Sequence, residues 1–154
     1  MKKLSVLAFL TLFFSHFGFA ADPVNSSTFG SVAIDGFDTV AYWTENRAVE
    51  GEKKFTYKYK DAKWRFASKA NMELFAANPD KYLPEYGGYC AWAMSDDKLA
   101  SVDGEAWTMF EGKLYLNYNK RVMKDWREQK PKFIGEANGF YKARFPNEAQ
   151  SANY

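Results

Sequence analysis

The sequence predicts an α+β fold, in which a small antiparallel sheet built from two hairpins packs with short helices and C-terminal helices follow. Apolar residues alternate with polar ones in two pairs of short runs, and a tight turn separates the runs of each pair. Between these pairs and after them, apolar residues recur at helical spacing, each time following a residue that can cap a helix. No long crossover segment joins two strands, as a parallel sheet would require. With 154 residues, 47% hydrophobic and 26% charged, the chain suits one compact domain.

The first hairpin is predicted from aromatic rings that alternate with polar residues before and after Asp61-Ala62. A two-residue turn at this point sets Tyr59 opposite Trp64 and Tyr57 opposite Phe66. All of these rings then share one face, so we expect that face to lie against the core.

The second hairpin is marked by Glu111-Gly112, because glycine readily takes the left-handed conformation that a tight turn needs. Pairing about this turn sets Met109 opposite Leu114 and Trp107 opposite Leu116. The result is a second apolar face.

Helices are predicted where apolar residues recur at helical spacing after a residue that can cap a helix. Asp38 is expected to cap a short turn, and Ser68 a helix that stops at Asn78-Pro79. Asn119 is expected to cap a further helix. Pro131 can open the last helix at its first position.

The N-terminus has the features of a secretory signal peptide, which we expect to span 1–20 and to be cleaved after Ala20. Lys2 and Lys3 precede a short apolar run, and small residues follow it. The prediction is therefore an exported protein, periplasmic or secreted, with no membrane span after cleavage.

The remaining chain is divided by composition into three parts. Small polar residues predict a flexible arm over 21–30. The main domain is expected over 31–126, and a helical extension over 127–154.

Cleavage of the signal peptide would leave few residues for catalysis. The only histidine, His16, would be lost with the leader, and Cys90 is the only cysteine. Without imidazole, nucleophilic triads and histidine-bound metals are excluded. Lys and Arg fall from 21 to 19 and equal the 19 Asp and Glu, so a neutral chain has no overall field to attract nucleic acid.

Four blocks follow one another in the chain: Ile34–Trp43, Trp64–Ser68 with Phe75–Tyr82, Tyr86–Ala93, and Leu114–Tyr118. Together they resemble the YHS-domain family, and in particular its short exported branch. The similarity runs from Ser31 to Trp126. It implies a small α+β domain. In the wider family it also implies association with heavy-metal transporters and multicomponent monooxygenases, where paired cysteines bind metal.

The chain departs from the metal-binding pattern of that family. Thr39-Val40-Ala41 stands where the pattern has its first cysteine, and Ala67 and Asn71 stand where it has the later pair. The metal role therefore does not transfer through those positions.

Candidate ligand-binding residues gather in two segments. Tyr89, Cys90 and Trp92 follow a Gly-Gly pair within Gly87–Met94, while Asp38 and Tyr42 belong to the Asp35–Trp43 turn. We expect a small ligand to be held where these two segments meet. The alternative is that the rings form the core and that Asp38 is a cap.

Cys90 has three interpretations. If residues 90–94 are helical, its thiolate and the Met94 thioether share a face and suit a soft metal such as Cu(I). Cys90 is otherwise a small buried hydrophobe, or it forms an intermolecular disulfide or adduct after export.

Three classes of function are thus open. The first is a non-catalytic binding or accessory domain that holds a small ligand or a metal. The second is an interaction module for another protein of the cell envelope. The third is an enzyme that uses Asp38 with Tyr89 or Cys90.

Overall fold

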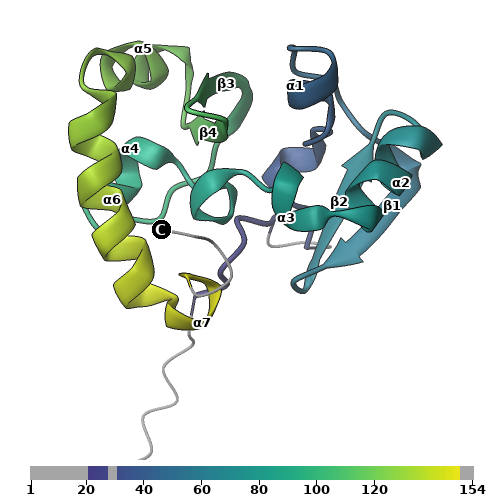
Figure 1. Ribbon diagram of the computed structural model, residues 1–154, viewed down its shortest axis with the longest axis horizontal. Helices are drawn as coiled ribbons and strands as arrows, with labels where there is room; N and C mark the ends of the chain where they lie inside the picture. Colours follow the sequence, from purple (N-terminus) through teal and green to yellow (C-terminus); the bar gives the residue numbers. More distant parts are fainter. Residues whose placement is uncertain (1–20, 28–30, 150–154) are drawn as a thin grey trace, which may run out of the picture.

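The computed structural model describes residues 21–27 and 31–149 and has the predicted α+β fold (Figure 1). The predicted signal peptide, residues 1–20, lies outside the described residues. In chain order the elements are η1 (Ile34–Gly36), α1 (Ala41–Thr44), β1 (Glu52–Tyr59), β2 (Ala62–Phe66), α2 (Lys69–Ala77), α3 (Pro79–Tyr82), η2 (Glu85–Gly88), α4 (Ala91–Met94), β3 (Asp103–Phe110), β4 (Lys113–Asn117), α5 (Lys120–Glu128), α6 (Lys130–Arg144) and α7 (Pro146–Ala149).

The two hairpins do not join in the single small sheet that we expected. Each forms its own two-stranded antiparallel sheet, β1-β2 and β3-β4. In Figure 1 the β1-β2 hairpin lies with α2 at one end of the molecule, and α4, α5 and α6 lie at the other. Within the described part of the chain, no helix is long and apolar enough to cross a membrane.

The β3-β4 hairpin has the predicted register. Met109 pairs with Leu114 and Trp107 with Leu116. Glu111 and Gly112 have φ angles of 50° and 70°, so both turn residues are left-handed, as a tight hairpin turn requires.

The register predicted for the β1-β2 hairpin is wrong by two residues. Tyr57 pairs with Trp64, and Tyr59 pairs with Ala62. The turn is at Lys60 and Asp61, whose φ angles are 48° and 58°. Because side chains alternate with a period of two, this shift changes the partners but leaves the same rings on one face.

The rings of this hairpin converge on Phe75 of α2, which is fully buried. Its ring centroid lies 5.1 Å from that of Phe66 and 6.0 Å from that of Tyr57. The Tyr59 and Trp64 rings lie at 5.9 and 5.4 Å. One residue of α2 therefore joins the helix to the hairpin.

The predicted helix caps are present. Ser68 Oγ accepts a hydrogen bond from the Asn71 backbone N–H at 3.1 Å, at the start of α2. Asn119 Oδ1 accepts one from the Val122 N–H at 2.9 Å, at the start of α5. Pro131 lies in the first turn of α6, where a missing N–H is tolerated.

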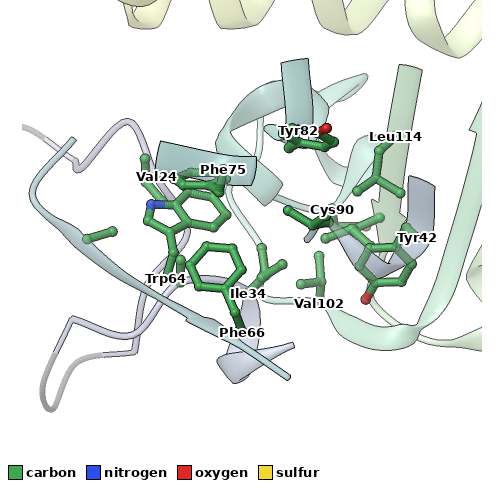
Figure 2. Packing of buried hydrophobic residues seen from close by; sticks show 14 residues of the cluster. Val24, Ile34, Tyr42, Trp64, Phe66, Phe75, Tyr82, Cys90, Val102 and Leu114 are labelled. Carbon is green, nitrogen blue, oxygen red and sulfur yellow. The ribbon is translucent and has the colours of Figure 1, made fainter. Parts of the chain in front are cut away.

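The buried hydrophobic residues form two clusters. Figure 2 shows the first, with Trp64, Phe66 and Phe75 toward one side and Tyr42, Cys90 and Leu114 toward the other. The second cluster joins η2, α4, β4, α5 and α6 and contains Tyr86, Ala91, Met94, Tyr115, Trp126, Ala137, Tyr141 and Phe145.

The C-terminal helices belong to the second cluster. The boundary expected after residue 126 falls inside α5, and α6 contributes Ala137 and Tyr141 to the buried residues. The Tyr86 hydroxyl donates a hydrogen bond to Asn138 Oδ1 at 2.9 Å. The residues we expected to form an extension thus complete the core.

The described part of the expected flexible arm is bound to the domain. In this N-terminal segment, residues 21–27, Val24 is only 3% exposed. The Asn25 N–H donates to the Gly87 carbonyl at 2.9 Å, and Asn25 Nδ2 donates to the Gly88 carbonyl at 3.0 Å. The expectation of a loose arm is corrected for these residues, because a buried valine and paired backbone groups hold the segment.

Gly87 is required by this contact. Its φ is +61°, and a Cβ atom there would lie 1.9 Å from the Pro23 carbonyl oxygen. Gly87, the first glycine of the pair that suggested a ligand site, therefore accommodates the chain's own N-terminal segment.

Candidate ligand groove

A groove of about 600 Å³ lies beside α4, between α5, α6 and the loop over 95–100. We call it the α4 groove. Its main lining residues are Cys90, Trp92, Tyr118, Val122, Phe133 and Glu136. Its volume is within the range of small-molecule sites in proteins.

Aromatic side chains form much of its wall. Trp92 is 36% exposed and Tyr118 is 55% exposed, although both are large and partly apolar. The Phe133 ring lies 6.2 Å from the Trp92 ring, at an interplanar angle of 52°. Exposed rings gathered around one concavity are typical of a surface that binds something.

Cys90 contributes to the wall of the groove. It is 1% exposed, and its thiol donates a hydrogen bond to Asn117 Oδ1 over 3.7 Å. Its backbone N–H donates to the Ala100 carbonyl at 3.1 Å. Cys90 is therefore both a member of the first buried cluster and a wall residue of the groove.

Charged groups of the groove belong to its edge. Lys98 and Asp96 form an ion pair, and both side chains are exposed. Glu136 of α6 is exposed as well. Two carboxylates and one ammonium group at the edge disfavour a negatively charged ligand.

Asp38 does not reach the groove. It is fully buried, and its Oδ1 accepts hydrogen bonds from the backbone N–H groups of Val40 at 2.9 Å and Ala41 at 3.2 Å. Its Oδ2 accepts from the Ala67 N–H at 2.8 Å and from Asn71 Nδ2 at 2.7 Å. Four donors satisfy this carboxylate, so it ties the α1 turn to the start of α2.

Tyr42 and Tyr89 also lie elsewhere. Tyr42 is buried, and its hydroxyl donates to the Gly104 carbonyl at 2.8 Å. Burial raises the pKa of Tyr42 far above its usual range. Tyr89 donates to the Asp22 carbonyl at 2.8 Å, and burial raises the pKa of its phenol as well. Of the residues expected to bind a ligand, Cys90 and Trp92 line the groove, whereas Asp38, Tyr42 and Tyr89 do not.

The two sulfur atoms expected to bind Cu(I) belong to different clusters. Cys90 packs in the first and Met94 in the second. Cys90 precedes α4 with φ −56° and ψ 118°, which is not helical, so the two side chains do not share a helix face as we expected. Among the described residues, no group of three or more His, Cys, Asp or Glu side chains is placed to hold a metal.

Sequence reasoning identified Trp92 and Cys90 but missed Tyr118 and Phe133. Tyr118 follows β4, where the buried run Leu114–Asn117 ends and the next side chain is exposed. Phe133 lies on α6 and is only partly buried. A ring directly after a fully buried strand was the available signal for Tyr118.

Comparison of the chain with protein-family models, with curated proteins and with solved structures finds no match.

Proposed function

We propose that this protein is a non-catalytic binding domain and that the α4 groove holds a small, flat, largely apolar molecule. The observation that carries the proposal is the position of three rings, those of Trp92, Tyr118 and Phe133, around one concavity of about 600 Å³. Flat apolar molecules gain both burial and ring contacts in such a site.

We further propose that the domain is an exported accessory protein of the YHS type. The hydrogen bonds of Asp38 support the resemblance, because they join two of the blocks that resemble the family. The Asp38 carboxylate accepts from the N–H groups of Val40 and Ala67 and from the side-chain amide of Asn71. These are positions at or beside those where the metal-binding members have cysteines. In this chain the Asp38 carboxylate and its hydrogen-bond donors would hold these segments together, as a bound metal would in those members.

The alternative of an enzyme that uses Asp38 with Tyr89 or Cys90 gains no support from the geometry. Asp38 is enclosed by four donors, Tyr89 binds the N-terminal segment through Asp22, and Cys90 faces the groove. A shared catalytic centre would need these groups around one point.

Heteronuclear NMR of the ¹⁵N-labelled protein tests the proposal. Naphthalene is the probe, and the side-chain indole signals are followed during titration. Trp92 is the only one of the five tryptophans that lines the groove, so its indole signal should shift saturably while those of the buried Trp64 and Trp126 do not.

Two matched variants complete the experiment. Trp92→Ala should weaken naphthalene binding about tenfold, because a wall ring is lost. Leu74→Ala removes a side chain of similar exposure, 42%, from α2 at the other end of the molecule and should leave binding unchanged. Absence of saturable binding, or equal effects of both variants, would overturn the proposal and leave the protein-partner alternative.

A further inference from the structure

The side chain of Asn117 lies directly behind the wall of the α4 groove. Asn117 ends β4 and is fully buried. Its Oδ1 accepts from the Cys90 thiol at 3.7 Å and from the Trp92 backbone N–H at 3.4 Å. Both of these residues line the groove, whereas Asn117 contacts it only through them.

The amide nitrogen of Asn117 has no hydrogen-bond partner within the residues that the structure describes. Exchanging the amide oxygen and nitrogen would not solve this, because Nδ2 would then face the Trp92 N–H, which is a donor. Trp43 and Trp126 also have unpartnered ring N–H groups, but neither residue lines the groove. An unpaired buried donor is rare enough in proteins to require an explanation.

We propose that Asn117 Nδ2 is the polar recognition point of the groove, and that the ligand is an uncharged aromatic molecule with a carbonyl acceptor. This inference rests on the proposed function of the groove. The ring lies among Trp92, Tyr118 and Phe133. Because Nδ2 is enclosed and Cys90 is only 1% exposed, the carbonyl oxygen can accept from Nδ2 only once the Cys90 side chain rotates away. The carboxylates of Asp96 and Glu136 at the edge select against an anion.

Three probes with the same ring system separate the contributions of the ring, the carbonyl acceptor and a negative charge to binding. These are 2-acetylnaphthalene, 2-isopropenylnaphthalene, in which CH₂ replaces the carbonyl oxygen, and 2-naphthoate. Pairing a buried donor should make the ketone bind on the order of tenfold more tightly than the alkene. The naphthoate should bind more weakly than the ketone.

The ¹⁵N-labelled wild-type protein supplies a direct measurement that needs no substitution at Asn117. The side-chain NH₂ signal of Asn117 should move downfield with the ketone and stay in place with the alkene. The indole signal of Trp92 should respond to both.

Asn117→Leu removes the donor, so the ketone and the alkene should bind this variant with about equal affinity. If this variant fails to fold, because Oδ1 also holds the Trp92 N–H, the wild-type amide signal decides the matter. Equal affinities of ketone and alkene, or an unmoved Asn117 signal, would overturn the inference and leave the proposed function standing. Failure of every uncharged probe to bind would overturn both.

Discussion

Gly87→Ala tests how the N-terminal segment is held, and its cost can be worked out from two terms. The left-handed φ of +61° costs an alanine about 1–2 kcal/mol. The new Cβ would lie 1.9 Å from the Pro23 carbonyl oxygen, which is backbone and must move. If the segment detaches, Val24 loses its burial, worth about 1.5–3 kcal/mol. The expected loss of unfolding free energy is about 2.5–5 kcal/mol.

Gly112→Ala is the matched control. Gly112 has a similar φ of +70°, but a Cβ there would have no neighbour within 4 Å. This variant should lose only the conformational term of about 1–2 kcal/mol. Urea denaturation measures both losses, and hydrogen exchange of the Asn25 amide should accelerate in Gly87→Ala alone. Equal losses in the two variants would refute the assignment of Gly87 to segment packing.

Three further predictions concern the core and the titrating groups. Phe75→Ala should lower the unfolding free energy by about 3–5 kcal/mol because it leaves a cavity among four rings, whereas Leu74→Ala should change it by less than about 1 kcal/mol in the same denaturation assay. Burial and the hydrogen bond to Asp80 raise the pKa of Tyr59 to about 12. The phenol of Tyr59 ionises near pH 10 in the unfolded chain. The contribution of the neutral phenol to the stability of the fold is therefore complete below about pH 10 and is lost as the pH rises through about 12. NMR of the Tyr59 ring carbons should show ionisation near pH 12, and ionisation near pH 10 would contradict the prediction. Cys90, 1% exposed, should react with a disulfide reagent at least roughly a hundredfold more slowly in the native protein than in guanidinium, and equal rates would show that the thiol is open to solvent.

The two hairpins show what local sequence can predict. Gly112 fixes the β3-β4 turn, since its left-handed φ makes one register much better than its neighbours. Lys60 and Asp61 also take positive φ in the β1-β2 turn, but neither residue type requires it. The alternation of rings is the same for registers that differ by two residues, so it could not locate the turn. Capping by Ser68 and Asn119 was predictable because a cap acts within one turn of the chain.

The candidate site was predictable only in part, because it is assembled from distant segments. Trp92 and Cys90 stood out by composition, and both line the groove. Tyr118 and Phe133 join them only through the packing of α5 and α6 on α4, which no local pattern reveals. Asp38 stood out as well, but its oxygens are taken by four donors whose positions depend on the tertiary fold.

The most direct test of the account is the location of a bound naphthyl probe by intermolecular NOEs. We predict contacts from the 2-acetylnaphthalene ring protons to the Trp92 indole, the Tyr118 ring and the Val122 methyl groups. Contacts to residues outside the α4 groove, or a probe that binds without any contact to these side chains, would contradict it.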